Sequence, residues 1–204
     1  MNIYKALIAD ANKETLSRHQ RQFDVLSEDL DLQGKEVEPI LNRLKDFQVA
    51  IPSWALGAGG TRFGRCSIGG EPKNLHEKIA DVGVLHALTQ SAGSISLHIP
   101  WDIPQDASAI KDFAHSQGIQ FDAVNSNTFQ DQASQTQSYK YGSLCHTDPQ
   151  IRALAVAHNK EVIDTGVSLG SDSLTVWLAD GSSFPGQLNF RKALERTLES
   201  LQEI

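Results

Sequence analysis

The stretch Ser96-Leu97-His98-Ile99-Pro100-Trp101-Asp102 decides the fold, because a histidine closes an apolar run there. A short and continuously apolar run is typical of a strand that is buried in a parallel sheet. The carboxyl ends of parallel strands carry the chemistry in many proteins, so a polar side chain there faces a pocket more often than a core. We therefore take His98 as the first candidate for a functional residue.

Beyond residue 47, short apolar runs alternate with amphipathic helical patterns. The runs predict strands at 49–56, 95–101, 119–125 and 174–178. Asn74 and Asp148 stand where helix N-caps are expected, and Gly118 and Gly170 stand where two helices should end. The pattern up to residue 47 is helical, with a polar face and no residues that indicate chemistry.

The alternation predicts an α/β fold in which helices connect parallel strands. Residues 48–204 contain four strand–helix units, half the number in a (β/α)₈ TIM barrel. We therefore predict an incomplete TIM barrel, its first half, over 48–204, preceded by a helical extension over 1–47. Because the sequence stops at Ile204 inside an amphipathic pattern, we expect a truncated barrel. A doubly wound sheet is the alternative, but the glycines at 57–60 lack the spacing of a dinucleotide-binding turn.

The composition excludes several classes of partner. The net charge of −7 disfavours binding to nucleic acid and to anionic membranes. No apolar segment approaches the ~20 residues that span a bilayer. Cys66 and Cys145 lack C-x-x-C spacing and follow no signal peptide, so we predict free thiols in a cytoplasmic protein.

Aromatic and imidazole side chains recur where the predicted strands end. These positions hold Trp54, His98, Phe129 and Trp177. One aromatic residue at a strand end usually serves packing, whereas several at equivalent positions offer flat surfaces for the C–H face of a sugar. Nearby amide and imidazole groups suit its hydroxyls. We therefore predict a carbohydrate-like pocket wall, with His98 as the first candidate for its functional residue. Paired carboxylates are absent from these strand ends, so we assign no metal ligand to this chain.

The glycine-rich segment at 57–64 permits a second interpretation. Arg62 and Arg65 could hold a phosphate there, although a mobile loop is the simpler explanation of the glycines.

Several long segments of the chain carry a family resemblance. They are Ile51-Pro52-Ser53-Trp54 with Gly59-Gly60-Thr61-Arg62-Phe63, the stretch from Ser96 to Asp102, Phe121-Asp122-Ala123-Val124-Asn125-Ser126-Asn127-Thr128-Phe129, Ser138-Tyr139-Lys140-Tyr141-Gly142-Ser143-Leu144, and Leu174-Thr175-Val176-Trp177-Leu178 with Asp180-Gly181-Ser182 and Phe184-Pro185-Gly186-Gln187. Together they resemble the metal-dependent L-rhamnose isomerases of the xylose-isomerase-like TIM-barrel group.

The resemblance implies a homotetrameric enzyme of the cytoplasm that interconverts L-rhamnose and L-rhamnulose. It implies that His98 lies beside the sugar ring oxygen and assists ring opening and hydrogen transfer. It also implies that Trp54, Phe129 and Trp177 form the hydrophobic wall of the sugar site, and that Phe63 reaches into a neighbouring subunit's site. The resemblance also implies a divalent metal as cofactor, with Mn²⁺ as the first choice. In that family the ligands of the metal come from later strands of the barrel, which have no counterpart in this sequence.

Two alternatives stay open from the sequence. A related barrel sugar or sugar-phosphate isomerase or epimerase would place Arg62 and Arg65 on a phosphate. A non-catalytic sugar-binding or assembly fragment would bind sugar or other subunits without a metal.

Overall fold

The computed structural model describes residues 5–57, 59–61, 64–67, 69–132, 135–182, 184 and 186–204. The described chain falls into two compact units. The first comprises described residues of Met1–Ile51, Ala55–Ile95 and Phe113–Gln120, and the second those of Pro52–Trp54, Ser96–Asp112 and Phe121–Ile204.

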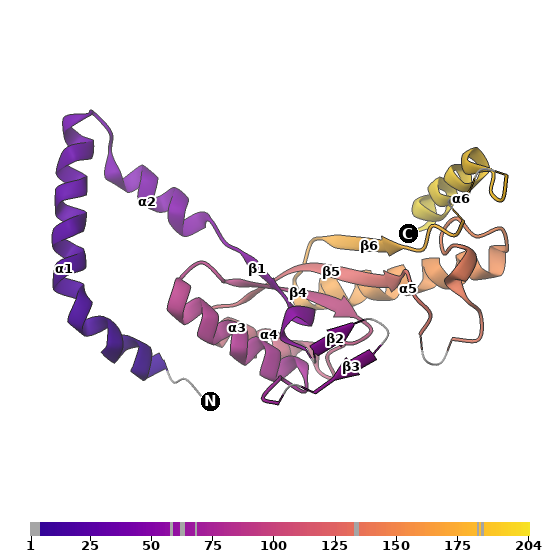
Figure 1. Ribbon diagram of the computed structural model, residues 1–204, viewed down its shortest axis with the longest axis horizontal. Coiled ribbons are helices and arrows are strands. Elements are labelled where there is room, and N and C mark those ends of the chain that lie inside the picture. Colours follow the sequence, from indigo (N-terminus) through magenta and orange to yellow (C-terminus); the bar gives the residue numbers. More distant parts are fainter. Residues whose placement is uncertain are drawn as a thin grey trace. The chain divides into compact units, whose positions relative to one another are not determined.

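Helices and strands alternate through most of the described chain (Figure 1). The helices are α1 (Lys5–Leu32), α2 (Val37–Asp46), α3 (Leu75–Thr89), α4 (Ala107–Ser116), α5 (Pro149–Leu169) and α6 (Phe190–Glu203). The strands are β1 (Ala50–Pro52), β2 (Gly59–Thr61), β3 (Gly64–Cys66), β4 (Ser94–Ile99), β5 (Gln120–Thr128) and β6 (Leu174–Leu178). Short 3₁₀ helices cover Ser53–Leu56 and Tyr139–Tyr141.

The main sheet is parallel and four-stranded, with strand order β1-β4-β5-β6. In the parallel pair β5–β6, Asn125 lies opposite Thr175 and Asn127 lies opposite Trp177. The predicted α/β class is confirmed, and a parallel sheet with alternating helices is consistent with an incomplete barrel. The proposed boundary between an extension at 1–47 and a barrel region at 48–204 stays a prediction.

The predicted helix boundaries are confirmed at their caps. The Asn74 side chain accepts a hydrogen bond from the Glu77 amide at 2.9 Å, and Asp148 accepts one from the Gln150 amide at 2.9 Å. Gly170 ends α5 with a φ of 86°, a left-handed conformation that favours glycine.

Three strand predictions need correction. The strand predicted at 49–56 is only Ala50–Pro52 before the chain turns into a 3₁₀ helix, since Pro52 has no amide hydrogen to continue the ladder. The strand predicted at 119–125 instead runs to Thr128, and that predicted at 95–101 ends at Ile99, before Pro100. The glycine-rich segment contains an unpredicted antiparallel pair, β2–β3, in which Gly59 lies opposite Cys66.

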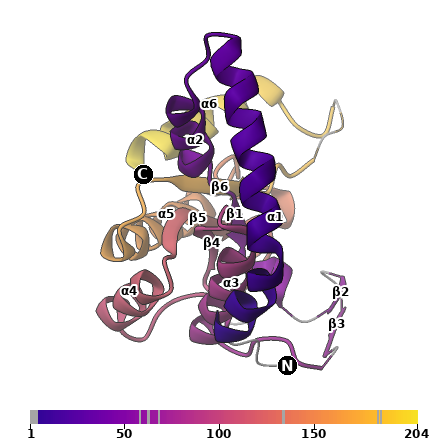
Figure 2. The ribbon, with the colours of Figure 1, turned by 90° about the vertical axis from the view of Figure 1, so that its left-hand side faces the viewer.

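The first unit contains the helices α1, α2 and α3. Helix α1 contacts α2 and α3 (Figure 2). The buried side chains of this unit include Ile79 and Val82 of α3, with Ile95 and Ile119 at the strands. None of the helices in the described part of the chain is long and apolar enough to cross a membrane.

The second unit places α5 against the sheet. Its apolar core includes Tyr139, Leu144, Ile151, Ala155 and Val156. The helix approaches the sheet closely at Gly166, where an added Cβ would lie 2.8 Å from Val124 Cγ2. Because this packing fixes one face of β5, the opposite face is left for the site described below.

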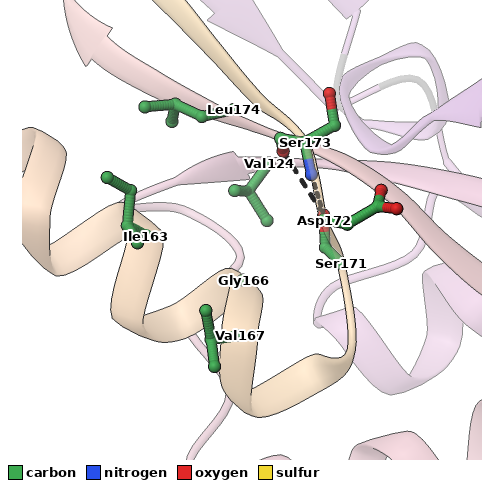
Figure 3. A pocket seen from close by; sticks show the side chains of 8 residues that line it. All are labelled: Val124, Ile163, Gly166, Val167, Ser171, Asp172, Ser173 and Leu174. Atoms are coloured by element: carbon green, nitrogen blue, oxygen red, sulfur yellow. Dashed lines mark hydrogen bonds between the residues drawn. The ribbon is translucent and has the colours of Figure 1, made fainter.

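A small cavity of about 130 Å³ lies between the last turns of α5 and the start of β6 (Figure 3). Its lining is mostly apolar and consists of Val124, Ile163, Gly166, Val167, Ser171, Asp172, Ser173 and Leu174. The cavity lies at the amino-terminal end of β6, whereas the chemistry-bearing residues predicted from the sequence stand at the carboxyl ends of strands. The cavity is therefore distinct from the candidate site.

Candidate functional site

His98, near the end of β4, lies within a group of aromatic side chains. Its ring centroid is 5.5 Å from that of Trp54 and 4.7 Å from that of Trp101, both in edge-on geometry. The rings of Phe129 and Trp177 lie closer to parallel with the imidazole, at an interplanar angle of 27° each, and their centroids are 6.0 and 6.2 Å from its centroid. Aromatic rings favour edge-to-face and offset contacts at such distances. We call these five residues the His98 aromatic cluster.

The cluster offers partly open aromatic surfaces. Trp54, Trp101 and Trp177 are 38%, 51% and 43% exposed. They are the only tryptophans of the chain, so its entire indole signal comes from this cluster. Exposed indole faces beside an imidazole suit a ligand with an apolar C–H face and polar edges.

Asn125 fixes the position of Trp177. The Trp177 indole N–H donates to Asn125 Oδ1 at 3.0 Å, while Asn125 Nδ2 donates to the Leu97 carbonyl at 2.9 Å. Asn125 is 4% exposed, so both bonds lie away from solvent. The amide therefore connects the indole of β6 with the backbone of β4.

Asp102 holds together the chain segments that carry Trp54 and His98. Its carboxylate accepts hydrogen bonds from the Ser53 hydroxyl and from the His98 backbone amide, the latter at 2.8 Å. Asp102 is 1% exposed, and buried carboxylates are stabilised by such donors. The arrangement restrains His98 at its backbone.

His158 supports the carboxyl end of β5 from helix α5. Its Nε2 accepts a hydrogen bond from the Asn127 amide at 3.1 Å, and its Nδ1 lies 3.6 Å from Glu161 Oε2. An open cavity of about 660 Å³ lies beside it and beside Trp101. The other residues that line this cavity are Pro100, Gln130, Asp131, Gln132 and Glu161.

Two groups of the second unit have displaced pKa values. Burial, and then the nearby Asp131 carboxylate, raise the pKa of Tyr139 to about 12. Burial first, and then Asp180, raise the pKa of the Cys145 thiol. Both effects favour the neutral form of these two side chains.

The structure brings together four of the five residues that the sequence placed in the site. Trp54, His98, Phe129 and Trp177 all belong to the cluster, and their roles stay predictions. Phe63 and Arg62 lie outside the described residues, and the Arg65 side chain is not described. Trp101 also stands at the end of a predicted strand, three residues after His98, and the structure adds it to the predicted residues of the cluster.

A metal centre has no counterpart in the described part of the chain. No group of three or more His, Cys, Asp or Glu side chains among the described residues is arranged to hold a metal ion. The metal implied by the family resemblance therefore has no fitting donor set in these residues.

Comparisons with known proteins give two sequence relatives, both described as probable sugar isomerases. The chain is 45% identical over 184 residues to the one of Rhizobium meliloti (strain 1021), a match that covers 90% of this chain and 43% of the relative. It is 48% identical over 185 residues to the one of Mesorhizobium japonicum, a match that covers 91% of this chain and 43% of that relative. The chain thus spans less than half the length of these curated relatives. No family model matches it.

Solved structures with a similar chain fold were also found. One is the D-psicose 3-epimerase of Clostridium cellulolyticum H10, with 17% identity, a TM-score of 0.46, and coverage of 65% of this chain and 42% of that chain. Another is the D-allulose 3-epimerase of Methylomonas sp., with 15% identity, a TM-score of 0.49, and coverage of 77% and 46%.

Proposed function

We propose that this chain forms the sugar-binding wall and contributes the proton-transferring histidine of a sugar isomerase. The observation that carries the proposal is the convergence of three tryptophans and Phe129 on His98. Identity of 45% and 48% to two probable sugar isomerases, over nine-tenths of the chain, supports the same class. L-Rhamnose, interconverted with L-rhamnulose, is the substrate that we favour, because the segments around the cluster resemble L-rhamnose isomerases.

The proposed roles follow from the chemistry of the side chains. The indole and phenyl rings bind the apolar face of the sugar and orient it. The His98 imidazole donates a proton to the ring oxygen as the bond between that oxygen and the anomeric carbon breaks. The anomeric hydroxyl gives its proton to solvent water, from which the imidazole is protonated again, so that the cyclic sugar opens to its carbonyl form. Asp102 and Ser53 restrain the backbone of His98 while this proton moves.

A divalent metal enters the proposal only through the family resemblance. In the family that the chain resembles, an ion such as Mn²⁺ polarises the sugar oxygens. The described residues do not supply its ligands, so we derive no step through the ion. The homo-oligomer and the cytoplasmic location likewise stay predictions. Sedimentation velocity of the purified chain tests the former.

Turnover experiments test the proposal. The 204-residue chain is assayed alone and joined to the part of the Mesorhizobium relative that the match does not cover, with L-rhamnose and Mn²⁺. We expect ketose formation by the joined protein and none by the chain alone. His98→Ala in the joined protein should lower kcat by about 10²–10⁴, the usual effect of removing a general acid or base. A kcat within about twofold of the parent would contradict the role of His98.

The alternatives are separated by the substrates and by the metal. Preference for a phosphorylated sugar would favour a sugar-phosphate isomerase or epimerase. Sugar binding that is unchanged by Mn²⁺, with no turnover in either protein, would favour a binding or assembly fragment.

A further inference from the structure

Asn127 has a buried side-chain amide that makes no hydrogen bond within the described part of the ligand-free chain. Its side chain is 0% exposed, and within the described part of the chain neither Nδ2 nor Oδ1 has a hydrogen-bond partner. Its backbone is satisfied, since the amide donates to His158 and the carbonyl accepts from Gln132 Nε2 at 3.2 Å. Because buried polar side chains are nearly always paired, an amide with both ends unpaired requires a ligand or another explanation.

The position of Asn127 relates it to the His98 aromatic cluster. Side chains alternate along a strand, so Asn127 shares one face of β5 with Asn125 and Phe129. Asn125 binds the Trp177 indole, and Phe129 lies 5.6 Å from the same ring. Trp177 itself is the partner of Asn127 in the β5–β6 register. The amide thus lies in the strand-end layer that carries the aromatic wall.

We propose that the Asn127 side chain binds a pair of neighbouring hydroxyl groups of the sugar. The inference rests on the proposed function and names a specificity residue for it. An amide presents donor N–H groups and an acceptor oxygen side by side. Two vicinal hydroxyls offer the matching acceptor and donor, while the aromatic rings cover the C–H face of the same sugar. No other described side chain of the cluster layer has both ends of an amide unpaired, since Asn125 is fully engaged by Leu97 and Trp177.

Burial of the amide has a consequence for binding. Since Nδ2 and Oδ1 have almost no accessible surface before binding, the structure around Asn127 must rearrange when a sugar arrives, and Trp177 is its neighbour in the β5–β6 register. Sugar binding should therefore change the indole fluorescence, which reports only on Trp54, Trp101 and Trp177.

The test exploits the opposite effects of removing an unpaired and a paired amide. Asn127→Leu replaces two unsatisfied polar atoms by an apolar group of similar size, so it should raise the melting temperature of the ligand-free chain by about 2 °C or more. Asn125→Leu, the matched control, breaks the hydrogen bonds to Leu97 and Trp177 and should lower it. Both variants of the 204-residue chain are then titrated with L-rhamnose by calorimetry and indole fluorescence. Asn127→Leu should weaken binding at least about tenfold, the ratio expected for a lost polar contact.

Each outcome separates the inference from the proposed function. A higher melting temperature with weaker L-rhamnose binding supports the inference, because a purely structural residue would lose stability. A melting temperature that falls as in the control overturns it, as does binding equal to that of the parent. If the parent chain binds L-rhamnose and Asn127→Leu binds it equally, only the role of Asn127 fails. If the parent itself binds no sugar, the proposed function fails and the inference with it.

Discussion

Trp177→Ala should weaken sugar binding about eightfold, because it removes one face of the aromatic wall. Trp177 is 43% exposed, which for a tryptophan corresponds to roughly 100 Å² of accessible surface. A sugar stacked on one face covers roughly half of that area, and at ~25 cal/mol per Å² the lost contact is worth about 1.2 kcal/mol. That free energy corresponds to the roughly eightfold change in Kd, which is accurate to a factor of about two.

Calorimetric titration of L-rhamnose into the parent and variant chains measures this change. Phe190→Ala is the control, since Phe190 is 50% exposed at the start of α6 and is not a member of the His98 aromatic cluster. In the joined protein, Trp177→Ala should raise KM more than it lowers kcat, because a stacking surface binds ground and transition states about equally. Affinities of parent and Trp177→Ala that agree within about twofold would refute the role of the wall.

Three further expectations concern the packing and titration of single residues. Gly166→Ala brings a methyl carbon to 2.8 Å from Val124 Cγ2, so urea denaturation should show a loss of about 1–3 kcal/mol, and an unchanged midpoint would argue against the tight α5–β5 contact. The raised pKa of Tyr139, about 12, means that the folded chain holds the phenol proton more tightly than the unfolded chain does. The neutral phenol therefore adds to the free energy of unfolding, fully below a pH of about 10, and this contribution is lost as the pH rises toward 12. The free energy of unfolding of Tyr139→Phe, measured against pH, should lack that alkaline loss. Equal pH profiles for the parent and the variant would contradict the raised pKa. Iodoacetamide at about pH 8 should modify the exposed Cys66 before Cys145, whose thiol pKa is raised by burial. Mass spectrometry of the peptides measures the order, and modification of Cys145 first would contradict this expectation.

The sequence was sufficient for the class of fold and for grouping most residues of the His98 aromatic cluster, whose roles in a site stay predictions. Apolar runs of strand length and the caps at Asn74 and Asp148 are local signals, and they correctly indicated alternating strands and helices. The carboxyl ends of parallel strands meet at one edge of a sheet, so the polar and aromatic residues at those ends could be grouped from the sequence alone. His98, Phe129 and Trp177 come together for this reason.

The remaining features depend on contacts that local patterns do not contain. The polar run at 125–128 is typical of a loop, yet it continues β5 because distant partners satisfy it. Asn125 bonds to Leu97, 28 residues away, and to Trp177, 52 residues away. The contact between Ser53 and Asp102 spans 49 residues. Strands as short as β2 and β3, built from glycine-rich triplets, give no periodic signal at all.

The most direct test of a sugar site at His98 is a titration of the ¹⁵N-labelled 204-residue chain with L-rhamnose, followed by NMR at the indole N–H signals. All three tryptophans of the chain lie around His98, so every indole signal reports on the proposed sugar site. We expect the three signals to shift together with one Kd, and Trp177→Ala to weaken the shifts of the remaining two. Indole signals that stay unmoved at about 10 mM sugar, roughly ten times the upper end of usual KM values, would contradict a sugar site at His98.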